Sequence, residues 1–118
     1  MNVSNKETDT AVFDRKGLLH LMMDDADLVE TIINAFLDDT PVQIRSLQDF
    51  LRTGDAKNVQ ITAHTIKGSS ATVRGEVMQQ VASAMEKAAE ERELDKVESL
   101  MPELEMQFAR LKKAMRGA

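Results

Sequence analysis

The sequence predicts an all-α protein: an antiparallel up-down-up-down four-helix bundle with a short extra helix at its N-terminal end. Three observations support this fold class. The 118 residues include five Gly and two Pro, which are too few turn-formers for a β-sandwich or barrel. Apolar residues recur at helical spacing along most of the chain. The connections between these stretches are short, and short connections place consecutive helices antiparallel.

The N-terminal part of the sequence predicts a leader and one short helix. Residues 1–11 are largely polar and form the leader, while residues 12–118 form the folded domain. Asp14 is a good N-cap for a short helix that begins at Arg15. Asp24 and Asp25 then offer caps for a much longer helix.

The longer helix is predicted from one apolar stripe. Its members are Leu28, Ile32, Phe36, Ile44, Leu47 and Leu51. Pro41 falls inside the stripe, where it removes one backbone donor and crowds the preceding turn. Because the stripe continues past Pro41, we expect one helix kinked near residues 38–40 rather than two helices.

Three further helices follow. Gly54 is expected to end the long helix as a left-handed residue, and Asp55 to cap the next one, which runs to about Val73. A turn at residues 74–76 and a charged hinge at residues 90–93 separate the last two stripes. These consist of Val77 or Met78, Val81, Met85 and Ala88 or Ala89, and then of Leu94, Val97, Met101, Leu104, Phe108, Leu111 and Met115. Pro102 is expected to bend the last helix or to lie in its first turns.

Composition excludes several classes of function. With no Cys, the chain has no disulfide, no thiolate catalyst and no Cys-ligated metal site. A net charge of −5 argues against a general nucleic-acid binder, which needs a cationic face. No apolar run approaches the roughly 18 residues of a membrane span, and the first ten residues lack the apolar stretch of a signal peptide. We expect a soluble cytoplasmic chain with no cofactor and no bound metal.

The helix over residues 55–73 holds residues that stability alone explains poorly. Its core face is predicted to consist of Val59, Ala63, Ile66, Ser70 and Val73. The opposite face holds Ile61, His64, Gly68 and Ala71, with Lys67 at one flank. A Gly in the middle of a helix costs about 1 kcal/mol relative to Ala. This row indicates an accessible imidazole with cleared space beside it, so that another protein can approach closely.

An imidazole accepts a phosphoryl group when its attacking nitrogen is unprotonated. Lys67 lies one turn after His64, where its cation could neutralise a phosphoryl group on the ring. Ile61 and Ala71 would give apolar contact to a partner. A plainer interpretation stays open, because a lone surface His often has no function and a helix Gly can serve close packing.

Residues 63–73, AHTIKGSSATV, resemble the signature of histidine-containing phosphotransfer (HPt) domains, in which His, two residues, Lys and Gly are followed by small residues. The similarity covers most of the chain. Residues 54–55 precede the signature helix as they do in the family, and residues 85–89, MEKAA, resemble the family's later hydrophobic-Glu-x-x-Ala segment.

The resemblance implies that His64 is the phosphoacceptor, which takes a phosphoryl group from an aspartyl phosphate on one receiver domain and passes it to another. It implies that Lys67 offsets phosphoryl charge and that Gly68 leaves room for the receiver's loops. Glu86 falls where the family often has Gln or Glu near the imidazole, and would bind the other ring nitrogen. A solvated surface charge is the alternative for Glu86.

The implied partners are response-regulator receiver domains and a hybrid histidine kinase, either separate or in the same polypeptide, with the domain itself a monomer. The residues predicted to contact a partner are Lys57, Ile61, Thr65, Ala71, Arg74 and Gly75. The sequence departs from the family at Arg74, where Gly is common, and at Gly75, where a small or apolar residue is common. This swap would shift the turn by one residue, and Arg74 would either disturb docking or face an acidic receiver cleft, as Lys57 could.

Other candidate sites are weaker. His20 lies in an apolar run and is expected to be a half-buried structural side chain. Two His so far apart give no convincing metal site. Helix capping and solvation explain the acidic pairs at residues 24–25 and 38–39 better than magnesium does. Since the nucleotide-binding pattern GxxxxGK[ST] is absent, the chain is not expected to be an enzyme with its own phosphoryl donor.

A rival hypothesis is a helical interaction or dimerisation module without chemistry. The last stripe, residues 94–115, spans about three heptads and is near the lower limit for a coiled coil. We therefore expect it to pack inside the bundle. A metal-independent enzyme ranks third, because no general acid and base visibly converge.

Overall fold

The computed structural model describes residues 11–117, which are helical throughout apart from short connections and contain no strand. Residues 1–10 of the predicted leader, and Ala118, lie outside the described residues. The five helices are α2 (Arg15–Leu21), α3 (Ala26–Arg52), α4 (Ala56–Thr72), α5 (Glu76–Glu90) and α6 (Leu94–Met115). The predicted all-α class is confirmed.

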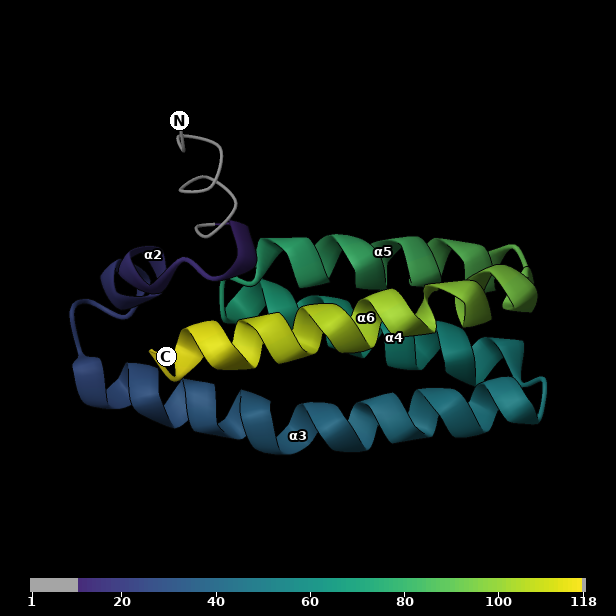
Figure 1. The fold of residues 1–118 in the computed structure, drawn as a ribbon, viewed down its shortest axis with the longest axis horizontal. Coiled ribbons are helices and arrows are strands. Elements are labelled where there is room, and N and C mark those ends of the chain that lie inside the picture. The colour runs from purple at the N-terminus through teal and green to yellow at the C-terminus, as the bar shows by residue number, and fades with distance from the viewer. Residues whose placement is uncertain (1–10, 118) are drawn as a thin grey trace.

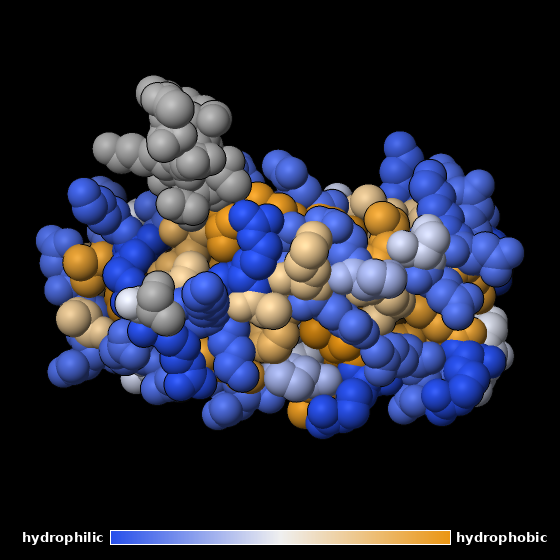
Figure 2. Space-filling model, viewed as in Figure 1, coloured by the Kyte–Doolittle hydropathy of each residue, from blue (hydrophilic) through white to orange (hydrophobic). Residues whose placement is uncertain are grey.

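The four long helices lie side by side, and α2 lies at one end of them, next to the start of α3 (Figure 1). Helix α4 packs against α3 and α5, and α6 packs against the same two helices. Their shared core is mostly aliphatic, and the rings of Phe36 and Phe108 contact each other within it, with centroids 5.9 Å apart. The largest fully buried apolar side chains are Leu18, Leu47, Ile66, Met78, Met85, Leu104 and Leu111. Mostly hydrophilic side chains cover the face seen in Figure 2, with apolar ones visible between them along the middle.

Helix α3 is continuous through Pro41, so the prediction of one helix rather than two is confirmed. The predicted stripe is wrong by one residue in the first half of this helix. Leu28 is exposed and Ile32 is half-buried, whereas Val29 and Ile33 are buried. Both members of each adjacent pair are apolar, so periodicity alone did not identify which one faces the core.

The stripe of α6 is buried within its own chain. Val97, Met101, Leu104, Leu111 and Met115 are all buried in the common core. The apolar stripe on which the dimerisation hypothesis depended therefore packs against helices of the same chain and is not available to a second copy. Pro102 lies well inside α6, not in its first turns.

The turn between α3 and α4 agrees with the prediction. Gly54 has a φ of 72°, and its left-handed conformation lets the Asp55 N–H donate to the Phe50 carbonyl at 2.9 Å. The Asp55 side chain caps α4 by accepting from the Asn58 N–H at 3.1 Å. A second hydrogen bond from the Asn58 amide helps to lower the pKa of Asp55.

The turn between α4 and α5 has the same form, with Arg74 as the left-handed residue at a φ of 65°. The Gly75 N–H donates to the Ser70 carbonyl at 2.8 Å, and the Arg74 N–H donates to the Ala71 carbonyl at 3.0 Å. The turn is therefore not shifted to Gly75. A Cβ on Gly75 would lie 2.8 Å from Leu111 Cδ2, so packing against α6 explains this glycine.

Gly54→Ala should lower the free energy of unfolding by about 1 kcal/mol, because an L-residue is disfavoured in the left-handed region. No atom lies within 4 Å of the added Cβ, so a clash does not contribute. Urea unfolding followed by circular dichroism measures the change. Arg74→Gly is the matched control and should raise stability, since the half-exposed Arg74–Asp14 pair that it removes contributes little. Loss of stability in both variants would contradict this account.

Candidate functional site

Helix α4 has one buried face and one open face, as the spacing of its residues predicted. The buried face consists of Val59, Ala63, Ile66, Ser70 and Val73. Ser70 is satisfied within the core because its hydroxyl donates to the Ile66 carbonyl at 2.7 Å. This packing fixes the rotation of α4, and therefore the direction in which its other side chains point.

The open face carries His64 near the middle of α4. Its side chain is 66% exposed, and Ile61, one turn earlier, is 51% exposed. One turn later, a Cβ on Gly68 would have no neighbour within 4 Å. The space beside the imidazole is therefore open, and close packing does not explain Gly68.

One carboxylate, that of Glu86, contacts both His64 and Lys67. Glu86 extends from α5, where one of its oxygens, Oε2, lies 2.8 Å from Nδ1 of His64. Its other oxygen, Oε1, accepts from Nζ of Lys67 at 2.6 Å. With a side chain only 18% exposed, Glu86 is not a solvated surface charge.

The ionisation of Glu86 decides which nitrogen of His64 carries the proton. Burial acts to raise the pKa of Glu86, but hydrogen bonds from Lys67 and His64, together with their charges, outweigh it and hold the pKa below 4.5. At neutral pH the carboxylate is ionised and can only accept hydrogen bonds. Nδ1 must therefore donate, and in the neutral ring Nε2 keeps an unshared electron pair.

This arrangement leaves an exposed nucleophilic nitrogen whose ring is fixed from behind. Each carboxylate oxygen takes one donor, so these contacts restrict rotation of the exposed His64 ring and of Lys67. Lys67 differs from the expectation in one respect. Its ammonium group contacts Glu86, so in the unmodified protein it does not lie beside Nε2, where a phosphoryl group would be bound.

The six predicted partner-contact residues differ in exposure, and Ala71 is half-buried. Lys57, Ile61 and Thr65 are exposed, although the Thr65 hydroxyl donates to the Ile61 carbonyl of its own helix. Arg74 is about half exposed and pairs with Asp14 at 3.7 Å. Gly75 is buried and packs close to Leu111 of α6, which gives it less accessible surface than the other predicted contacts.

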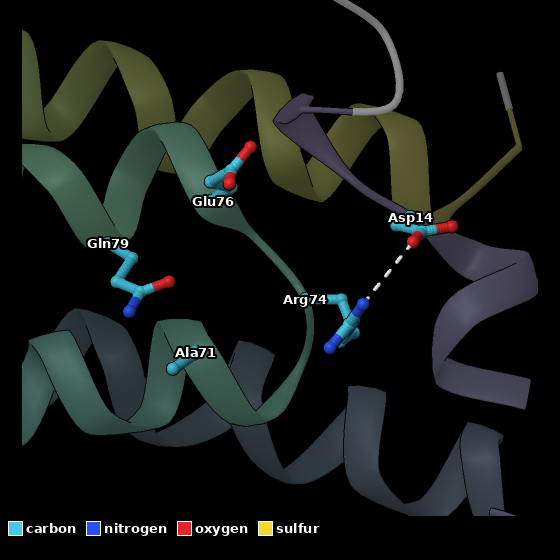
Figure 3. A pocket seen from close by; sticks show the side chains of 5 residues that line it. All are labelled: Asp14, Ala71, Arg74, Glu76 and Gln79. Atoms are coloured by element: carbon cyan, nitrogen blue, oxygen red, sulfur yellow. Dashed lines mark ion pairs between the residues drawn. The ribbon is translucent and has the colours of Figure 1, made fainter. Parts of the chain in front are cut away.

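Ile61, His64, Gly68 and Ala71 form one row along the open face of α4, which we call the His64 row. Two surface hollows lie at its two ends, where they include Ala71 and Ile61. The first, of about 210 Å³, is lined by Asp14, Ala71, Arg74, Glu76 and Gln79. Figure 3 shows Arg74 extending from the α4–α5 connection towards Asp14 at the start of α2. The second, of about 360 Å³, is lined by Ala56, Lys57, Gln60, Ile61, Ala89, Glu90 and Arg92.

The contribution of Asp14 to the first hollow was missed by sequence reasoning. Asp14 was predicted as an N-cap, and its carboxylate does accept from the Gly17 N–H at 2.9 Å. Its backbone N–H also donates to the Arg74 carbonyl at 3.2 Å. No local signal connects residues so far apart in sequence.

The remaining candidates carry no site. His20 is exposed, so the prediction of a half-buried side chain is wrong, because the last turn of α2 directs it to solvent. Within residues 11–117, no group of three or more His, Cys, Asp or Glu side chains could hold a metal ion. In the same range, no helix is both long and apolar enough to cross a membrane.

Lys67→Met should destabilise the protein at neutral pH and much less in acid. The pKa of Glu86 is lower in the folded protein than in the unfolded chain, so its ionisation stabilises the fold above pH 4.5. That stabilisation is lost as the pH falls through the folded-state pKa. Removing Lys67 removes one cause of the low pKa while burial, which raises it, remains.

The measurement is the free energy of unfolding as a function of pH, with Lys57→Met as the matched control. Lys57 is an exposed lysine of the same helix and forms no ion pair within the described part of the chain. The difference between Lys67→Met and wild type should shrink in acid, and the control difference should not. A constant difference for Lys67→Met would contradict the role given to Glu86.

Comparison with known proteins gives two matches. The family model described as "Hpt domain" matches residues 31–114. The crystal structure of histidine-containing phosphotransfer protein B (HptB) from Pseudomonas aeruginosa PAO1 matches with a TM-score of 0.83 and 25% sequence identity, over 90% of this chain and 92% of that chain. No curated protein matches the chain significantly. Because the family model spans well over half of the sequence, the chain belongs to the Hpt domain family of phosphorelay phosphocarriers.

Proposed function

We propose that this chain accepts a phosphoryl group on Nε2 of His64 from the aspartyl phosphate of one receiver domain and passes it to an aspartate of another. One observation carries the proposal: an oxygen of the Glu86 carboxylate lies 2.8 Å from Nδ1 of an exposed ring. In the neutral ring this contact places the proton on Nδ1, so Nε2 is free to attack phosphorus. The open space at Gly68 supports the same role, because a receiver's loops can approach the ring there.

The chemistry requires little from this chain beyond a well-oriented nucleophile. In the transfer step, Nε2 forms a bond to phosphorus while the bond between phosphorus and the aspartyl oxygen breaks. The electron pair of the broken bond leaves with the receiver's carboxylate. In this scheme the chain is a transfer intermediate rather than an enzyme, and the catalytic groups and any metal belong to the receiver.

The docking surface in this proposal surrounds His64 on α4. Ile61 supplies exposed apolar area, and Thr65 lies beside it. Lys57 and Ala71 line the two flanking hollows, which could take side chains of the receiver. Arg74 lines the hollow that also holds Ala71, so its half-exposed guanidinium would help docking by facing an acidic group of the receiver.

We also propose a helix topology, an oligomeric state and a set of partners for this chain. The short connections between the four long helices, and the packing of α4 and α6 against both α3 and α5, support an antiparallel up-down-up-down bundle. Burial of the α6 stripe supports a monomer. Membership of the family supports response-regulator receivers and a hybrid histidine kinase as partners. It also supports a cytoplasmic location for this chain.

His64→Ala should abolish phosphorylation. Wild-type protein incubated with a phosphorylated receiver domain should acquire an acid-labile, base-stable label, as a phosphoramidate bond behaves. His20→Ala is the matched control, because it removes the other histidine, which is also exposed, and should be labelled like wild type. Label that persists in His64→Ala would overturn the assignment of the phosphoacceptor.

Gly68→Gln should slow transfer from a receiver by about tenfold or more, equivalent to about 1.4 kcal/mol, because the side chain occupies space that the receiver needs. Rapid-quench kinetics measure the rate. Gly68→Ala serves as a control for stability and should raise the free energy of unfolding by about 1 kcal/mol, since no neighbour opposes the added Cβ. Unchanged transfer in Gly68→Gln would show that the open space has no role in docking.

A further inference from the structure

We infer that Glu86 exchanges the cation that it holds during phosphorylation: its carboxylate bonds to both Lys67 and the neutral His64 ring before transfer, then keeps the phosphorylated, positively charged ring and releases Lys67 to the phosphoryl oxygens. This inference rests on the proposed function and goes beyond it, because it assigns a sequence of contacts to the three side chains. Glu86 is then a positioning residue that acts through Lys67.

The starting contacts are those of the unmodified protein. Each oxygen of Glu86 takes one donor, with Nζ of Lys67 at 2.6 Å and Nδ1 of His64 at 2.8 Å. The side chain of Glu86 is partly withdrawn from water, at 18% exposed, so a neighbouring positive charge stabilises its negative charge. When the imidazole is neutral, Lys67 is the cation bonded to this carboxylate.

The transfer step changes which groups are charged. As Nε2 forms its bond to phosphorus, the aspartyl carboxylate leaves and Nδ1 keeps its proton. The ring therefore becomes an imidazolium, bonded through Nδ1 to Glu86, and two negative charges appear on the phosphoryl group at Nε2. The ring now supplies the positive charge that Glu86 needs, while the phosphoryl group lacks one.

Lys67 is placed to move between these two positions. It lies one turn after His64 on the same helix, and its long side chain is 31% exposed. The ammonium group can therefore leave Oε1 of Glu86 without disturbing the core. An amide at position 86 would accept from Nδ1 equally well but would hold neither cation, so the exchange depends on the carboxylate.

The first test follows Lys67 directly, with phosphoramidate as a small-molecule phosphoryl donor. Nitrogen NMR of the lysine side chains reports the hydrogen bond from Nζ through its coupling to the acceptor. In wild type, coupling to the Glu86 carboxylate should be present before phosphorylation, and coupling to phosphorus should replace it afterwards. Coupling to Glu86 that persists in the phosphorylated protein would overturn the exchange.

The second test measures the pKa of the phosphorylated ring by phosphorus NMR. Glu86→Gln keeps an acceptor for Nδ1 but loses the charge, and should lower this pKa by about one unit or more. Lys67→Met is the matched control and should not lower it, because the exchange has already moved Lys67 away from the carboxylate. Equal ring pKa values in wild type and Glu86→Gln would overturn the inference.

These tests fail separately from the proposed function. Phosphoramidate labels the imidazole without a receiver domain, so partner exchange can be observed even if no receiver transfers to His64. In that case the proposed function fails and the exchange stands. Transfer from receivers combined with a Lys67 that stays on Glu86 refutes the exchange alone.

Discussion

The packing of one face of α4 into the core is the constraint on which the rest of the site depends. The same seventeen residues must pack one face of this helix and expose His64 on the other. One face consists of small and medium side chains that pack into the core between α3 and α5. Since helical geometry ties the two faces together, fixing the buried face also fixes the direction of His64. The adjoining α5 then brings Glu86 within hydrogen-bond distance of the ring. The other features of the site depend on this packing.

The sequence predicted the buried face of a helix best where only one helical phase was consistent with the pattern of residues. The buried face of α4 was identified because Val59, Ala63 and Ile66 share one helical phase, whereas the phase that holds His64 also holds Gly68. The start of α3 was predicted one residue out of register because apolar residues stand in adjacent pairs, as at Leu28 and Val29. The role of Glu86 beside the ring came from resemblance to a family, and its bond to Lys67 was not predicted. That bond depends on the rotation of α5 against α4, which no local pattern specifies.

Two residues in this region are poor choices for stability alone. Gly68 leaves the middle of a helix without a side chain, although the structure has room for one. Arg74 adopts a left-handed conformation that glycine would adopt more easily. Both belong to the open side of the molecule, and the half-exposed side chain of Arg74 lines a hollow beside the His64 row. Departures from the most stable choice of this kind are typical of surfaces that bind a partner.

Under the proposed function, the exposure of His64 affects how long a phosphoryl group on its ring survives. Enzymes that form reactive intermediates usually close over them to exclude water. Here the ring is two-thirds exposed, and the neighbouring glycine leaves it uncovered. A phosphoryl group on such a ring would be as accessible to water as to the next protein. Its lifetime would then depend on the strength of its own bond and on the rate at which receivers arrive, so this domain would transmit information without storing it.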